Sequence, residues 1–73
     1  ILEMKFLITG STGLVGSKVV QDLIKRNHTV YSCYHDEKPV HGTPILLDLT
    51  DQDRIIQTLQ EIKPDRIIAC KES

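Results

Sequence analysis

The chain has 73 residues, and its 9 Lys and Arg nearly balance its 10 Asp and Glu, which leaves a net charge of −1. A domain of this size buries only roughly 60% of the surface that its unfolded chain exposes, so we expect one small unit of marginal stability. The balanced charge argues against nucleic-acid binding, which needs a basic stripe. No apolar run approaches the ~20 residues of a membrane span, and no charged-then-apolar leader is visible. We therefore expect a cytoplasmic protein that binds neither nucleic acid nor membrane.

The first half of the chain alternates strand and helix patterns. Residues 5–9 form a short apolar, β-rich run of the kind found in strands buried on both faces of a parallel sheet. From residue 14 to 26 the period becomes helical, and Asn27 fits a left-handed C-terminal cap. Residues 29–34 predict a second strand. The buried face of the helix is expected to consist of Leu14, Val15, Val19, Val20, Leu23 and Ile24.

The second half repeats the alternation. Residues 35–43 are polar and contain a proline and a glycine, which predicts a loop, and residues 44–48 predict a third strand. Thr50 is the predicted N-cap of the next helix, with Asp53 as its capping partner, and Pro64 ends that helix. Residues 66–70 predict a fourth strand. The buried stripe of this second helix is expected to consist of Ile55, Ile56, Leu59 and Ile62.

This succession predicts an α/β fold. Alternating strands and helices imply a parallel sheet with right-handed crossovers. In the doubly wound arrangement the strands lie in the order 3-2-1-4, with one helix on each face, which is the N-terminal half of a Rossmann fold. The first and fourth strands diverge at their carboxyl ends, and we expect a ligand in the crevice between them.

A glycine cluster lies where the first strand turns into the first helix. Gly10 permits a sharp turn out of the strand, Gly13 lets a pyrophosphate approach the backbone, and Gly16 lets the helix pack close to the sheet. The phosphates would sit on free N–H groups at the helix N-terminus, where the dipole favours negative charge. A plain tight turn is the alternative, but the strand before and the amphipathic helix after favour the phosphate site.

These residues carry a family resemblance. Residues 9–16 read T-G-x-x-G-x-x-G, which resembles the motif of extended short-chain dehydrogenases/reductases. Residues 46–51 and 62–68 are similar to the dTDP-dehydrorhamnose reductase branch, which also includes the regulatory subunit of methionine adenosyltransferase. The resemblance covers residues 4–70 but only the first part of a family member. It implies a Rossmann fold, NAD(P) binding, and a reductase or epimerase of nucleotide-activated sugars.

The resemblance also implies a set of cofactor-binding residues. Asp48 matches the family aspartate that accepts a hydrogen bond from the adenine amino group, and Leu49 would lie against the ring. Without the resemblance, an aspartate in front of a helix is more often a cap. The residues that would line the pyrophosphate or supply backbone at the helix start are Gly10, Thr12, Gly13, Leu14, Val15 and Gly16.

The chain departs from the family pattern after the second strand. The family has an acidic residue at the end of the second strand, which would hold the ribose hydroxyls, but this chain has Tyr34 there, followed by His35 and Asp36. Relatives that bind NADP carry an arginine in this stretch, and this chain has none there. The cofactor is therefore NAD or NADP, with a lean towards NAD because Asp36 and Glu37 would repel a 2′-phosphate. At the other end, Lys71-Glu72 replace the small residues that the family has after the fourth strand, so residues 71–73 need not follow the family path.

Two further patterns are interpreted as non-functional. Tyr34 and Lys38 have the spacing of the catalytic Tyr-x-x-x-Lys pair, but in the family that pair shares one helix face, and Pro39 argues against a helix here. We therefore predict no catalytic residue in the chain. Cys33 and Cys70 end strands separated by one other strand, roughly 9–10 Å apart, which is beyond disulfide reach. We expect free thiols, and the histidines at positions 28, 35 and 41 lack metal-ligand spacing.

The resulting hypothesis concerns the whole protein. Residues 1–73 are interpreted as a partial NAD(P)-binding domain that lacks the catalytic and substrate parts, and residues 1–3, which precede Met4, as a cloning addition or part of a longer natural N-terminus. The parent would reduce a nucleotide-activated keto-sugar such as dTDP-dehydrorhamnose, with a Tyr/Lys pair beyond residue 73. The alternatives are a non-catalytic regulatory subunit and a nucleotide-sugar epimerase. The unpaired edge of the fourth strand would allow a homodimer.

Overall fold

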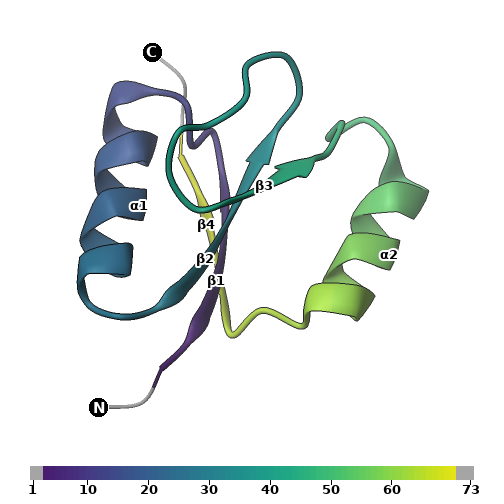
Figure 1. Cartoon of the computed structure of the whole chain (residues 1–73). Helices are drawn as coiled ribbons and strands as arrows, with labels where there is room; N and C mark the ends of the chain where they lie inside the picture. Colours follow the sequence, from purple (N-terminus) through teal and green to yellow (C-terminus); the bar gives the residue numbers. More distant parts are fainter. Residues whose placement is uncertain (1–2, 71–73) are drawn as a thin grey trace.

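A computed structural model describes residues 3–70, and the predictions for residues 1–2 and 71–73 lie outside the described residues. Every predicted helix and strand is present, in the predicted order (Figure 1). The elements are β1 Lys5–Thr9, α1 Leu14–Lys25, β2 Thr29–Tyr34, β3 Thr43–Leu46, α2 Gln52–Ile62 and β4 Arg66–Ala69.

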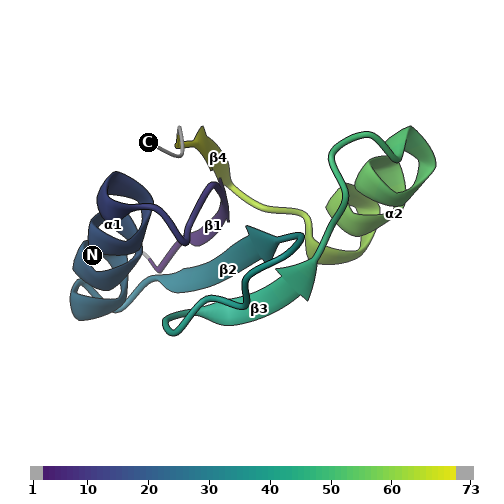
Figure 2. The same cartoon turned by 90° about the horizontal axis from the view of Figure 1, so that it is seen from above.

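The strands form one parallel sheet in the order β3-β2-β1-β4, which confirms the predicted topology. The central strand β1 is buried on both faces. Phe6 and Ile8 pack with Val20 of α1 on one face, and Leu7 packs with Leu59 of α2 on the other. The helices therefore lie on opposite sides of the sheet, as Figure 2 shows from above. This arrangement leaves the carboxyl ends of the strands uncovered by either helix.

The amino end of the sheet is joined by contacts between distant parts of the chain. The backbone N–H of Lys5 donates to Oδ2 of Asp65 at 2.7 Å, and the N–H of Asp65 donates back to the Lys5 carbonyl at 2.8 Å. These bonds span 60 residues. They dock the turn after α2 against the start of β1 and thereby set the register of β4.

The segment between β3 and α2 differs from the prediction. The strand covers Thr43–Leu46 rather than residues 44–48, although the Leu47 N–H still donates to the Tyr34 carbonyl. The N-cap of α2 is Asp51, whose side chain accepts from the Arg54 N–H at 3.1 Å. The prediction of Thr50 as the cap was wrong, because its N–H and hydroxyl both donate to Asp48 and hold it outside the helix.

The helices bury fewer apolar side chains than predicted. Leu14 and Val15 are 83% and 63% exposed, because the first turn of α1 packs through the buried Gly16 against the loop after β1. Ile56 on α2 is 55% exposed, and Thr58 is buried instead, with its hydroxyl donating to the Arg54 carbonyl. The stripe that does pack against the sheet consists of Ile55, Leu59 and Ile62.

Candidate functional site

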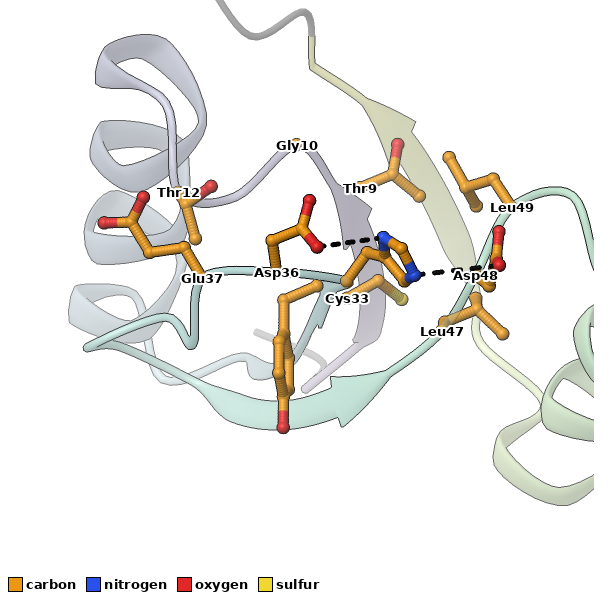
Figure 3. Close-up of a pocket in the computed structure, with 11 residues that line it drawn as sticks. Thr9, Gly10, Thr12, Cys33, Asp36, Glu37, Leu47, Asp48 and Leu49 are labelled. Carbon is orange, nitrogen blue, oxygen red and sulfur yellow. Dashed lines mark ion pairs between the residues drawn. The ribbon is translucent and has the colours of Figure 1, made fainter.

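A groove of about 470 Å³ lies at the carboxyl ends of β1, β2 and β3 (Figure 3). It brings together most of the side chains predicted for cofactor binding, which are Gly10, Thr12, Tyr34, His35, Asp36, Asp48 and Leu49. Four more lining residues were not predicted as site residues: Thr9, Cys33, Glu37 and Leu47. For Thr9, Cys33 and Leu47 the only sequence signal was their place at or just beyond the ends of strands, whereas Glu37 had been noted only for its charge. Gly13, Leu14, Val15 and Gly16 do not line this groove and lie on the α1 side of it.

The position of the groove corrects one expectation. A crevice between β1 and β4 was predicted, but the chain after β4 lies directly against the glycine turn. The Cys70 N–H donates to the Thr9 carbonyl at 3.0 Å, and a Cβ built on Gly10 would lie 1.9 Å from the Cys70 carbonyl oxygen. The backbone at Cys70 therefore fills the space beside Gly10, and the groove opens over β2 and β3 instead.

The glycine turn has the predicted sharp bend. Gly10 has φ +68°, a conformation that favours glycine, and its carbonyl accepts from the Gly13 N–H at 3.3 Å. Gly16 lets the first turn of α1 approach closely, but what it approaches is the glycine turn after β1 rather than a strand. A Cβ at Gly16 would lie 2.1 Å from the Gly10 carbonyl oxygen. The turn and the first helical turn thus pack backbone against backbone.

The N-terminus of α1 has the features of an anion site. Gly13 is the N-cap, no side chain caps the helix, and its first turn contains no acidic residue. The backbone of Gly13 is extended (φ −74°, ψ 170°), so its conformation alone does not require glycine. Backbone N–H groups at an uncapped N-terminus and the helix dipole both favour a negative ligand.

The opposite end of the groove carries a carboxylate held in its ionised form. Both the hydroxyl and the backbone N–H of Thr50 donate to Oδ1 of Asp48, at 2.7 and 2.9 Å. These bonds, with a smaller contribution from His35, lower the pKa of the Asp48 carboxyl below its ordinary value. Nε2 of His35 lies 3.7 Å from Oδ2 of Asp48, and Nδ1 lies 3.3 Å from Oδ1 of Asp36. In Figure 3 two dashed lines mark these contacts, one ending at Asp36 and the other at Asp48.

Buried polar contacts support the floor and the rim. The Ser11 hydroxyl donates to the Cys33 carbonyl, and the Ser32 hydroxyl donates to the His41 carbonyl at 2.9 Å, which ties the loop after β2 to the sheet. Burial raises the pKa of the Cys33 thiol to about 11. Cys33 and Cys70 are both free, as predicted.

The remaining sequence interpretations concern catalysis, metals and membranes. Tyr34 ends β2 and no helix follows before β3, so Tyr34 and Lys38 do not share a helix face. Within residues 3–70, no group of three His, Cys, Asp or Glu side chains could hold a metal ion. Neither helix in that range is long and apolar enough to cross a membrane.

The fold is that of a Rossmann-type nucleotide-binding protein. Its defining features here are the parallel sheet, the glycine turn after β1, the uncapped N-terminus of α1 and the groove at the carboxyl ends of the strands. The chain belongs to the NAD dependent epimerase/dehydratase family, whose model matches residues 6–73. This confirms the broader resemblance drawn from residues 9–16.

Individual relatives include a probable reductase, and the solved structures that resemble the chain include a UDP-glucose 4-epimerase. The chain is 38% identical over 68 residues to the probable low-salt glycan biosynthesis reductase Agl14 of Haloferax volcanii, which covers 92% of this chain and 23% of the relative. Among solved structures, Bordetella bronchiseptica WbmH in complex with NAD+ matches with a TM-score of 0.81 at 20% identity, over 99% of this chain and 27% of that one. Brucella ovis UDP-glucose 4-epimerase in complex with NAD matches with a TM-score of 0.82 at 20% identity. This match covers 96% of this chain and 23% of the epimerase chain. The chain thus spans about a quarter of the length of these relatives.

Proposed function

We propose that this chain is the NAD-binding part of an oxidoreductase that acts on a nucleotide-activated sugar, and that the whole protein is a reductase of a keto-sugar such as dTDP-dehydrorhamnose. The observation that carries the proposal is the uncapped N-terminus of α1 beside a groove whose far end holds the ionised Asp48. An anion site beside the groove and a hydrogen-bond acceptor at the far end of the groove match the two ends of an ADP group.

Each proposed contact uses a group in this chain. The pyrophosphate would accept from the backbone N–H groups that follow Gly13, where a side chain would stand in its way. Asp48 would accept from the adenine amino group, with Leu49 against the ring. The ribose would then lie between these two ends, beside Tyr34, His35 and Asp36. When bound, NAD supplies hydride transfer, and this chain's residues serve to bind and orient it.

Relatives support the reductase over the other two candidates. Agl14, which is named a reductase, is 38% identical to this chain, whereas the epimerase structures are about 20% identical. An epimerase remains the second candidate because those structures share the fold. A regulatory subunit is the third, and a Tyr-x-x-x-Lys helix after residue 73 would argue against it. The two free thiols support a cytoplasmic location, where cysteines stay reduced.

The test is cofactor binding by the whole protein that contains this chain. In a fluorescence titration, the native protein should bind NADH, and Gly13→Val should weaken binding at least about tenfold, since its side chain would occupy the phosphate position. Lys18→Val introduces the same side chain on the exposed face of α1 and should bind like the native protein. Circular dichroism would establish that both variants are folded. Equal NADH affinity of Gly13→Val and the native protein would reject the pyrophosphate assignment.

A further inference from the structure

The carboxylate of Asp48 uses its two oxygens differently. Oδ1 accepts from both the hydroxyl and the backbone N–H of Thr50, at 2.7 and 2.9 Å. Oδ2 lies 3.7 Å from Nε2 of His35, which belongs to a different segment of the groove rim. A carboxylate oxygen has about two lone-pair sites, so the two bonds from Thr50 satisfy Oδ1. Oδ2 is therefore the oxygen that remains for a ligand, and it is the oxygen that the imidazole faces.

The imidazole of His35 lies between two carboxylates and beside an open space. Nδ1 lies 3.3 Å from Oδ1 of Asp36, while Nε2 faces Asp48, and dashed lines in Figure 3 mark both contacts. The side chains of His35 and Asp48 are 59% and 47% exposed, so packing does not fix their separation. Both also border a hollow of about 440 Å³ on the α2 side, whose lining residues are His35, Leu46, Asp48, Asp51 and Arg54. The imidazole thus has a space to turn into when it leaves Oδ2.

We propose that His35 and the adenine amino group compete for Oδ2 of Asp48, so that the pH controls dinucleotide binding. The inference rests on the proposed function, which places adenine at Asp48. An amino group that donates to Oδ2 must come within about 2.9 Å of it. The imidazole, at 3.7 Å, already occupies part of the space around this oxygen. Adenine that enters from the groove must therefore turn the ring of His35 aside.

Protonation of His35 strengthens the contact that adenine must break. A neutral imidazole has one N–H and can donate to only one of the two carboxylates, whereas an imidazolium has two N–H groups and a positive charge. The protonated ring can therefore pair with Asp36 and Asp48 at once. Histidine is the side-chain type whose charge ordinarily changes between pH 5 and pH 8. Dinucleotide binding should thus become tighter as the pH rises through this range.

Other charged or titratable groups face the imidazole from three segments. Glu37, on the loop of His35, and Tyr34, at the end of β2, line the groove. Asp51 and Arg54, at the start of α2, line the α2-side hollow. Side chains of these types do not ordinarily change charge between pH 5 and pH 8. Among the described residues that line the two spaces, His35 is the one histidine, so a change of binding in this range is assigned to it.

The direction of the pH dependence distinguishes competition from simple attraction. The pyrophosphate of a dinucleotide is negatively charged. A histidine that only contacted the ligand would therefore bind it more tightly when protonated, at low pH. Competition for Oδ2 predicts the opposite direction, because protonation ties His35 to the acceptor that adenine needs.

The experiment is calorimetric titration of the whole protein with NAD+ near pH 5.5 and near pH 8. The native protein should bind NAD+ at least about fivefold more weakly at the lower pH. His35→Ala should bind more tightly than the native protein near pH 5.5, and its two affinities should agree within about twofold. ADP-ribose, which keeps the ADP group and lacks nicotinamide, should give the same pattern. That result excludes titrating groups around the nicotinamide as the cause.

His41→Ala is the matched control. His41 is an exposed histidine on the same loop, and it lines neither the groove nor the α2-side hollow. This variant should keep the pH dependence of the native protein. Circular dichroism at both pH values establishes that the native protein and both variants are folded.

The outcomes separate this inference from the proposed function. If the native protein binds NAD+ at neither pH, the proposed function fails and the inference fails with it. If it binds NAD+ equally at both pH values, or more tightly near pH 5.5, the proposed function stands and competition is rejected. A pH dependence that persists in His35→Ala also rejects it. Loss of the pH dependence through weaker binding near pH 8 would make His35 a ligand contact rather than a competitor.

Discussion

Nε2 of His35 lies 3.7 Å from Oδ2 of Asp48, so a side chain just beyond β2 reaches the loop between β3 and α2. The other ring nitrogen of His35 faces Asp36 at 3.3 Å. One imidazole thus connects two carboxylates on separate segments of the groove rim. Together with the bonds from Thr50, it favours the ionised form of Asp48.

The lowered pKa of Asp48 predicts an acid-dependent contribution to stability. A carboxyl whose folded pKa lies below its unfolded value of about 3.9 stabilises the fold above that pH. The contribution is lost as the pH falls through the folded pKa. Asp48→Asn should therefore be less stable than the native chain at pH 7, and the difference should shrink below about pH 4. Urea unfolding at pH 7 and at pH 3 measures both free energies.

The control for Asp48 is Asp22→Asn, which removes an exposed carboxylate on α1. Its free energy of unfolding should follow the pH dependence of the native chain. If the curves for Asp48→Asn and the native chain run parallel from pH 7 to pH 3, the hydrogen bonds from Thr50 do not favour the charged form.

Gly16→Ala should destabilise the chain strongly. The new Cβ would lie 2.1 Å from the Gly10 carbonyl oxygen, and backbone on both sides leaves no flexible side chain to move. Overpacking of this kind costs about 2 kcal/mol or more. Lys18→Ala, on the exposed face of the same helix, should change the free energy of unfolding by less than about 0.5 kcal/mol. A Gly16→Ala chain as stable as the native one would show that α1 is not packed on the turn.

Cys33 should be protected from thiol reagents in the folded chain. Burial raises its pKa from 9.0 to about 11, so at pH 8 the thiolate fraction is about 100-fold lower than for an exposed cysteine. Labelling of the Cys70→Ser variant, which retains only Cys33, should be slower than labelling of the same variant in urea by at least that factor. The raised pKa also predicts that stability falls as the pH rises from about 9 to about 11. Equal labelling rates in the folded and unfolded chains would contradict the burial of this thiol.

Tyr34 should not be the proton donor of the proposed reaction. It ends β2 at the groove, outside any helix that could carry Lys38 on the same face. In the whole protein, Tyr34→Phe should retain turnover at saturating NADH, with a modest change in cofactor affinity. The 73-residue chain by itself should show no turnover, because a proton donor must lie within hydrogen-bond reach of the substrate. A loss of turnover by several orders of magnitude with NADH binding intact would identify Tyr34 as the acid.

Most of the fold was predictable from local patterns. The alternation of apolar runs predicted the sheet order, and Asn27, with φ 67°, has the left-handed conformation expected of a cap. The errors occurred where side chains compete for the same backbone. Thr50 is a residue type that often caps helices, but its hydroxyl donates to Asp48 instead. The cap of α2 is therefore Asp51, which accepts from the Arg54 N–H.

The site was predictable only in part. The positions of Gly10 and Asp48 followed from the motif and from the ends of strands, and the groove lies between them. The contact of His35 with Asp48 could not be predicted, because it joins residues on two strand ends with no fixed spacing between them. The same holds for the backbone at Cys70, which occupies the space beside Gly10 and moves the opening away from β4.

The bonds between Lys5 and Asp65 have a consequence for the timing of folding during synthesis. They join groups that are 60 residues apart, and a ribosome adds roughly 5–20 residues per second, so the partner of Lys5 is synthesised roughly 3–12 s later. Once β2 has been synthesised, β1 can pair with β2 but not yet with β4, and throughout the interval the turn at Gly10 lacks the Cys70 backbone that later packs against it. We expect the glycine turn after β1 to be the first part of the site translated and the last to become rigid.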